Sequence, residues 1–233
     1  MRFFVGTSGY SHKEWKGNFY PAKISPKDML PYYAERFTTV EMNNTFYRMP
    51  IEETMATWAA QVPDSFRFVI KAPQTITHRK RLRDAATEVD QLVRTAAVLQ
   101  NRLGPFLFQL PPNFKKDLPR LEAFLDFLGK RGSIAFEFRH ESWFDDEVMN
   151  CLRKYCCALC IADTEDFPNP DLIHTADWGY VRLRRDAYSE MDLKSWSKKL
   201  KSQSWGEVYV FFKHEETGSG PKLGARLIEL AGS

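Results

Sequence analysis

Charged and apolar residues alternate in the segment Ser133–His140, which reads SIAFEFRH. Apolar residues occupy every second position of this strand-like run, and Glu137 and Arg139 lie between them. Because successive side chains of a strand point to opposite faces, the two charges share one face. A carboxylate can transfer protons, and a guanidinium can bind an anion through its planar fork of donors. The segment therefore indicates a polar site on one side of a strand.

Polar residues recur toward the C-terminal ends of other strand-like runs, again on one face. Parallel strands covered on both faces would instead read as nearly continuous apolar runs. A purely structural network of ion pairs is the weaker alternative, because buried pairs seldom stabilise more than apolar residues of equal volume. We therefore expect a set of side chains to meet at the C-terminal mouth of a barrel: Glu41, Asn43, Lys71, Gln109, Glu137, Arg139, Asp163, Arg182, Arg184 and Lys213.

The candidate catalytic residues are carboxylates, a lysine and a histidine. Glu137 is the predicted general acid or base, with Glu41 or Asp163 as the second carboxylate, because opposed environments can separate two pKa values. Lys71 could neutralise developing charge, and a Schiff base on Lys71 or Lys213 is an alternative role. His140 directly follows the strand that carries Glu137 and completes the catalytic set.

The candidate substrate-binding residues are cations, amides and aromatic side chains near the strand ends. Arginines bind anions through paired donors, and aromatic rings can stack on a base or sugar. The set comprises Arg139, Arg182, Arg184, Lys213, His214, Asn43, Gln109, Tyr10, Trp15 and Trp143.

A glycine-rich turn follows the last strand-like run, in KHEETGSGPKLGARL, and leads into a helix predicted to begin at Pro221. In (β/α)8 enzymes the loops after the last two strands often hold a phosphate beside a helix N-terminus. An ordinary helix start capped by Ser219 or Thr217 is the equal alternative. The basic run HRKRLR at 78–83 is typical of a solvated face, although at the rim of a cationic pocket it would favour polyanions.

The sequence identifies no cofactor. A divalent metal held by Glu137, Asp163, His140 and His214 is an alternative, since these ligand types suit zinc or manganese. No compact metal-binding motif supports that alternative.

Eight strand-like runs alternate with amphipathic segments, which predicts a (β/α)8 TIM barrel in a single domain over residues 1–233. An open doubly wound sheet is the rival fold. The segment TEDFPNPDLIHTADWG contains two prolines and no helical period, so we expect the sixth helix to be missing or reduced. The expected strands span 2–7, 38–46, 67–72, 105–110, 133–139, 158–163, 180–185 and 207–213. The expected helices span 28–36, 52–61, 85–102, 118–130, 147–154, 193–201 and 221–230.

Composition limits the classes of partner and location. Lys and Arg number 33 against 30 Asp and Glu, a formal net charge of +3 that does not indicate nucleic acid by itself. The N-terminal apolar run is too short for a signal peptide, and no other stretch approaches a membrane span. We expect a cytoplasmic protein that does not contact membranes; the sequence does not indicate its oligomeric state.

Several segments together resemble the YecE-like family, also called domain of unknown function seventy-two: GTSGYSHKEWKGNFYP, FTTVEMNNTFYRMP, FRFVIKAPQTITH, LFQLPPNF, AFEFRHESWF and YVRLRR. The resemblance covers nearly the whole chain and implies a TIM barrel, with no established reaction. Many members carry a His-Gly pair after the seventh strand and an Asn-Asn-Asp stretch after the eighth. Here those positions read Arg184-Arg185 and Lys213-His214-Glu215, which indicates a distinct branch.

Three functions remain open from the sequence. The leading hypothesis is an enzyme of the hydrolase or lyase type acting on a small anionic substrate, phosphorylated compounds included. One alternative is a metal-dependent phosphodiesterase acting on nucleic acid. The other is a non-catalytic module that binds an anion or nucleic acid.

Overall fold

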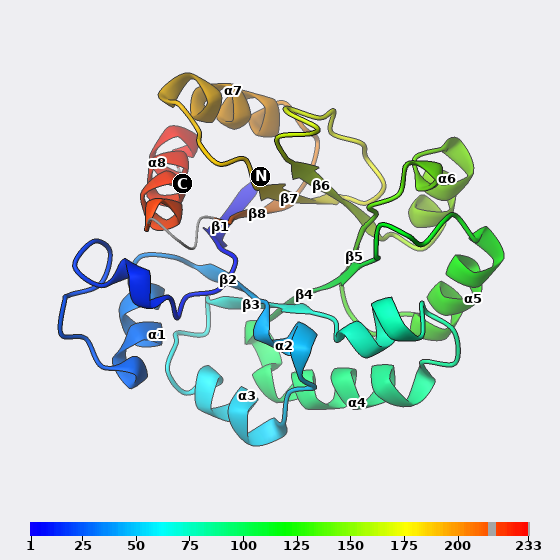
Figure 1. Cartoon of the computed structure of the whole chain (residues 1–233), viewed down its shortest axis with the longest axis horizontal. Helices are drawn as coiled ribbons and strands as arrows, with labels where there is room; N and C mark the ends of the chain where they lie inside the picture. Colours follow the sequence, from blue (N-terminus) through cyan, green and yellow to red (C-terminus); the bar gives the residue numbers. More distant parts are fainter. Residues whose placement is uncertain (214–217, 233) are drawn as a thin grey trace.

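The computed structural model describes residues 1–213 and 218–232. Within these ranges eight parallel strands follow one another in the sheet order β1-β8-β7-β6-β5-β4-β3-β2. Figure 1 shows them as an inner ring surrounded by helices, so the predicted (β/α)8 barrel is confirmed. The strands are β1 (Arg2–Thr7), β2 (Thr39–Met42), β3 (Arg67–Lys71), β4 (Leu103–Gln109), β5 (Ile134–Glu137), β6 (Ala158–Asp163), β7 (Trp178–Leu183) and β8 (Glu207–Phe212).

The helices lie outside the ring, except between β6 and β7, where the described residues 164–177 form no helix. The helix expected after the sixth strand is therefore missing, as predicted. Pro168 and Pro170 each lack the N–H that a helix interior requires. No helix in the described ranges combines the length and apolar character needed to cross a bilayer. The α-helices are α1 (Pro26–Ala34), α2 (Asn44–Tyr47), α3 (Glu52–Ala59), α4 (Ala86–Ala96), α5 (Leu118–Leu128), α6 (Asp146–Lys154), α7 (Glu190–Lys201) and α8 (Ser219–Ala231). Short helical segments are η1 (Lys13–Trp15), η2 (Thr75–Arg79), η3 (Ala97–Arg102) and η4 (Glu141–Trp143).

The barrel closes between β1 and β2 through one parallel bridge, Ser8 to Glu41, and through a side chain. The hydroxyl of Tyr33, on α1, accepts a hydrogen bond from the Thr7 N–H at 2.9 Å and donates to the Thr39 carbonyl at 3.1 Å. Buried backbone groups need partners, and this phenol supplies one to each strand. Closure at this seam brings the ends of β1, β2 and β3 next to those of β7 and β8.

The barrel interior is filled with side chains below the C-terminal ends of its strands. Phe4 and Tyr209 stack there with ring centroids 4.6 Å apart, and the other buried residues of this inner core include Val69, Leu107, Ala135, Trp178 and Phe211. The described residues of this part of the interior therefore form a packed core, as in other barrels of this fold, where ligands bind at the C-terminal ends of the strands.

One expected strand is shorter than predicted. The run 38–46 was expected to be extended throughout, but β2 ends at Met42 and Asn44–Tyr47 forms the helical turn α2. The Thr45 hydroxyl lies 2.7 Å from the carbonyl oxygens of both Met42 and Lys71. This local hydrogen bonding competes with strand pairing, as is common for threonine.

Candidate active site

A buried cluster of ion pairs lies at the C-terminal end of the barrel interior. Arg182, on β7, contacts Glu41 of β2 with Nη2 at 2.7 Å and Glu137 of β5 with Nη1 at 2.6 Å. All three side chains are at most 2% exposed, so water does not screen these pairs. The structure thus brings together three residues that the strand pattern had assigned to one face.

Further donors complete the cluster. The Tyr180 hydroxyl donates to Glu41 Oε2 at 2.6 Å, and Ser8 Oγ donates to Glu41 Oε1 at 2.9 Å. Arg139 forms an ion pair with Oε1 of Glu137. Two carboxylates and two guanidinium groups therefore balance one another, and the cluster carries no net charge.

Both carboxylates are held in the ionised form. Burial by itself would raise the pKa of Glu137, but Arg182, Arg139 and Arg184 lower it to about 2. Burial opposes ionisation of Glu41 as well, and Arg182 with the Tyr180 hydroxyl brings its pKa below the usual value. A group that stays ionised near neutral pH is a poor general acid. In the structure both glutamates neutralise Arg182, and the role of Glu137 as general acid or base stays a prediction.

A cavity of about 710 Å³ lies beside this cluster. Its walls come from the ends of β1, β2, β3, β7 and β8, together with α2 and α3. Among the described residues the lining contains four cations and no carboxylate. It comprises Ser8, Gly9, Tyr10, Ser11, His12, Met42, Asn43, Asn44, Tyr47, Thr54, Trp58, Lys71, Arg182, Arg184 and Lys213.

Lys71 and Arg184 are half-buried in the cavity wall, and no carboxylate of the described ranges lies within 4 Å of either. The Lys71 ammonium lies over the Phe46 ring, 4.3 Å from its centroid. Burial, and then the charge of Arg182, lowers the pKa of Lys71 to about 8. The same two causes lower the pKa of Arg184. Since the cluster is balanced, the described lining, with these cations and the exposed Lys213, carries a positive charge.

Asp163 does not join the cluster, and its predicted place at the mouth is wrong. In the parallel register Ala162 pairs with Arg182 and shares its inner face, whereas Asp163 pairs with Leu183 on the outer face. The Asp163 carboxylate accepts hydrogen bonds from Trp196 Nε1 at 3.1 Å, on α7, and from Arg185 Nε at 3.1 Å. It joins β6 to the helix layer, away from the cavity.

Three other candidates have local or packing roles. His140 Nδ1 accepts a hydrogen bond from the Ser142 N–H at 3.1 Å and caps η4. Trp143 is fully buried and donates from Nε1 to the Phe114 carbonyl at 2.7 Å. Trp15 is 1% exposed and packs in the outer core. None of the three lines the cavity, because each side chain is engaged in the loops outside it.

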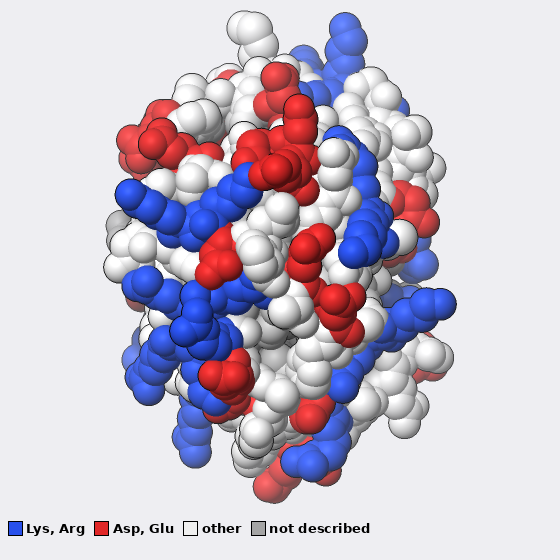
Figure 2. Space-filling view, turned by 90° about the vertical axis from the view of Figure 1, so that its right-hand side faces the viewer, with Lys and Arg blue, Asp and Glu red and all other residues white. Residues whose placement is uncertain are grey.

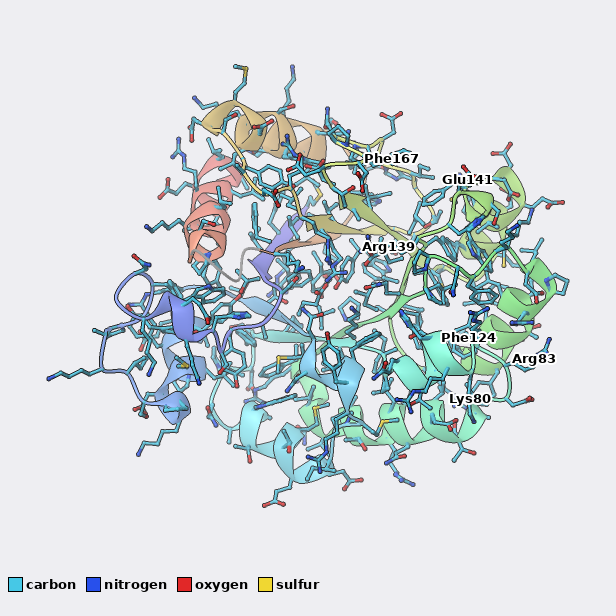
Figure 3. The ribbon with its side chains drawn as sticks, in the orientation of Figure 1. Lys80, Arg83, Phe124, Arg139, Glu141 and Phe167 are labelled. Carbon is cyan, nitrogen blue, oxygen red and sulfur yellow. The ribbon has the colours of Figure 1, made fainter. Side chains whose placement is uncertain are left out.

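The remaining candidates lie in or near the site. Tyr10 and Asn43 line the cavity, and the buried Asn43 Oδ1 has no hydrogen-bond partner among the described residues. Gln109 Oε1 lies 3.5 Å from Arg182 Nη1. Figure 3 shows Arg139 on the inner side of the ring. His214 lies outside the described residues, so its predicted role has no structural description.

Sequence reasoning missed Ser8 and Tyr180, the two hydroxyl donors to Glu41. The sequence could have indicated Tyr180, since it precedes Arg182 by two residues and must share its face. The sequence could not have indicated Trp58 and Thr54, because tertiary packing places α3 against the cavity.

No three His, Cys, Asp or Glu side chains in the described parts of the chain gather as a metal site. The proposed ligands Glu137, Asp163 and His140 separate into the ion cluster, the outer face of β6 and the cap of η4. The fourth, His214, is not described.

The basic run at 78–83 does not line the cavity. Figure 3 shows Lys80 and Arg83 at the outer edge of the ring, and Lys80 pairs there with Glu88 at 2.8 Å. Arg83 borders a separate groove beside α5. On the flank shown in Figure 2, basic and acidic side chains are interspersed. That face therefore offers no continuous basic surface to a nucleic acid.

Comparison with known sequences gives a consistent result. The sequence model of a protein family of unknown function, DUF72, matches residues 4–233. UPF0759 protein YecE of Escherichia coli K12 is 33% identical over 142 residues, which cover 60% of this chain. That match spans only 50% of YecE. UPF0759 protein YunF of Bacillus subtilis is 22% identical over 269 residues, covering 97% of this chain and 94% of YunF.

Solved structures show the same fold. A DUF72 family protein of Thermotoga maritima superposes with a TM-score of 0.85 at 26% identity, covering 100% of both chains. One of Enterococcus faecalis gives 0.81 at 21% identity, covering 99% of this chain and 96% of the other. A sugar phosphate isomerase/epimerase of Parabacteroides distasonis gives 0.57 at 12% identity, covering 99% and 94%. The last likeness shows the barrel fold alone.

Proposed function

The chain belongs to the DUF72 family of unknown function, and on this premise we propose that it is an enzyme acting on a small anionic substrate, such as a phosphorylated compound. The substrate binds in the cavity at the C-terminal mouth of the barrel, where enzymes of this fold have their active sites. The reaction therefore takes place in this cavity and not on the outer surface of the barrel.

One observation carries the proposal: the described lining of the cavity contains four cations and no carboxylate. Leaving Lys71 and Arg184 half-buried with no counter-ion from residues 1–213 and 218–232 costs free energy, because burial disfavours charge. A bound anion removes that cost by supplying the missing charge. An ordinary structural ion network would have paired these cations within the protein, as it does for Arg182.

The residues have distinct roles in this proposal. Arg184 and Lys213, after β7 and β8, bind the anionic group, in the region where many barrels hold a phosphate. Glu41 and Glu137 position Arg182. Lys71 is the acid–base group, since a pKa of about 8 lies near the working pH while that of Glu137 does not. This favours lyase chemistry over hydrolysis by a pair of carboxylates.

Titration with inorganic phosphate tests the anion site. Thermal unfolding is followed with phosphate and with chloride at equal ionic strength. Phosphate at 100 times its Kd should stabilise the fold by about 2.7 kcal/mol, or roughly 5–10 °C in Tm. Arg184→Gln should raise the Kd about tenfold, the loss of one hydrogen bond to a charged group.

The matched control is Lys198→Gln, which removes an exposed cation of α7 outside the cavity. It should bind phosphate like the wild type. Equal phosphate affinity in Arg184→Gln and the wild type, or a chloride effect as large as the phosphate effect, contradicts the proposed site. For the catalytic claim, turnover of a phosphorylated substrate that persists in Lys71→Met removes Lys71 from the mechanism.

A further inference from the structure

We propose that Lys71 forms an imine with a carbonyl group of the substrate, which makes the substrate class an aldehyde or ketone that also carries a phosphate or carboxylate. This inference rests on the proposed function, since the anionic group brings the carbonyl to Lys71. The imine is a covalent step beyond anion binding, and the substrate then carries a carbonyl group as well as an anionic group.

Lys71 is held where a nucleophilic amine can meet a ligand. It is the last residue of β3 and pairs with Leu107 of β4, so its backbone is fixed by the sheet and not by a loop. The Thr45 hydroxyl lies 2.7 Å from its carbonyl oxygen. The side chain runs beside the Phe46 ring into the cavity lining. A rigid element positions a reacting group more accurately than a flexible one.

Burial, and then the charge of Arg182, favours the neutral amine of Lys71 by lowering its pKa. The two carboxylates that act on Lys71, Glu41 and Glu137, are both engaged by Arg182. Arg182 and Arg184 oppose its protonation, and His78 is the nearby group whose own pKa Lys71 lowers. With a pKa of about 8, roughly a tenth of Lys71 is neutral at pH 7. An unperturbed lysine at the same pH is less than about 0.1% neutral.

The cavity has two chemically different ends. Its walls follow the strand order β7, β8, β1, β2 and β3, so Lys71 lies at one end of this arc. Arg184 and Lys213 lie at the other. The aromatic side chains of Tyr10 and Trp58 line the cavity as well. This arrangement fits a short molecule with an anionic group at one end and a reactive carbon at the other.

The step balances without an oxidant or reductant. The Nζ lone pair attacks the carbonyl carbon, and the C=O π pair moves to oxygen. A proton passes from nitrogen to that oxygen and gives a carbinolamine. The hydroxyl takes one further proton from water and leaves as water, while nitrogen forms a protonated C=N bond with the carbon. This iminium withdraws electrons, so a neighbouring C–C or C–H bond can break heterolytically, as in lyase chemistry.

Pyridoxal 5′-phosphate is a suitable probe because it carries both an aldehyde and a phosphate. The whole chain is incubated with it, reduced with borohydride, and mapped by peptide mass spectrometry. One equivalent should be found on Lys71. Pyridoxal without phosphate should label this residue at least tenfold more slowly, and inorganic phosphate should protect it. Lys71→Arg should lose the label yet bind inorganic phosphate, while Lys198→Arg should be labelled like the wild type.

The outcomes separate the two proposals. Label on Lys213 in place of Lys71, or spread over exposed lysines, overturns the imine. Phosphate binding with no label on Lys71 overturns the imine and leaves the anion site intact. Equal labelling of Lys71 by both aldehydes, with no protection by phosphate, overturns the anionic substrate class and the proposed function with it. Thermal unfolding of Lys71→Arg shows whether the variant is folded. If it is not, the labelling of Lys71 in the wild-type protein still tests the imine.

Discussion

Replacement of Arg182 by Met tests whether the two buried glutamates depend on one counter-ion. Arg182 is 2% exposed and contacts carboxylates at 2.6 and 2.7 Å, those of Glu137 and Glu41. Methionine fills much of the same space but leaves both carboxylates buried without Arg182. Removing one partner of a buried pair costs about 3–5 kcal/mol. For a chain of this length that lowers Tm by roughly 6–20 °C.

The effect should depend on pH in a defined direction. In the wild type the pKa of Glu137 is lowered to about 2, so its stabilising contribution is present above pH 4.5 and is lost toward pH 2. In Arg182→Met burial should raise the pKa of Glu41 above its usual value, and the pKa of Glu137 should rise less, because Arg139 still pairs with it. A carboxyl group whose pKa is higher in the folded than in the unfolded state stabilises the fold at a pH below its unfolded-state pKa. That stabilisation is lost as the pH rises through the folded-state pKa. The difference between the two proteins should therefore grow from pH 4.5 to pH 7.

Urea unfolding followed by tryptophan fluorescence at pH 5 and pH 7 measures this difference. The control is Glu41→Gln/Glu137→Gln/Arg182→Met, which leaves no buried charge at these positions and should recover much of the loss. A single Arg182→Met variant within about 1 kcal/mol of the wild type at pH 7 refutes the reasoning. So does a triple variant that is less stable than the single one.

Three further predictions concern the barrel seam and the cavity. Tyr33→Phe removes the hydroxyl between Thr7 N–H and Thr39 O and should cost about 1–3 kcal/mol in urea unfolding; an unchanged midpoint contradicts this role. Gly6→Ala places a Cβ 2.2 Å from the Thr39 oxygen and should cost roughly 3 kcal/mol; wild-type Tm would show that the seam is looser. Sulfate keeps its charge across neutral pH, so its calorimetric affinity should fall as pH rises through about 8, where Lys71 loses its proton. Lys71→Met should abolish this pH step, and a step that persists belongs to another group.

Much of this arrangement follows from local sequence. Period-two alternation in SIAFEFRH and YVRLRR indicates which face Glu137 and Arg182 share, because the strand repeat depends only on neighbouring residues. Eight such runs with helical segments between them predict the barrel. Pro168 and Pro170 predict the missing helix for an equally local reason. The resemblance to a known family pointed to the same fold.

Other features depend on contacts between distant strands. ALCIAD is apolar on both faces, so its own pattern could not orient Asp163; the register of β6 against β7 turns it outward. Arg182 lies 141 residues from Glu41 and 45 from Glu137 in sequence, and only barrel closure brings all three within hydrogen-bond distance. That pairing leaves Lys71 with no carboxylate partner in the part of the chain that the structure describes. Which charges neutralise one another depends on distances across the barrel, and alternation along one strand carries no information about those distances.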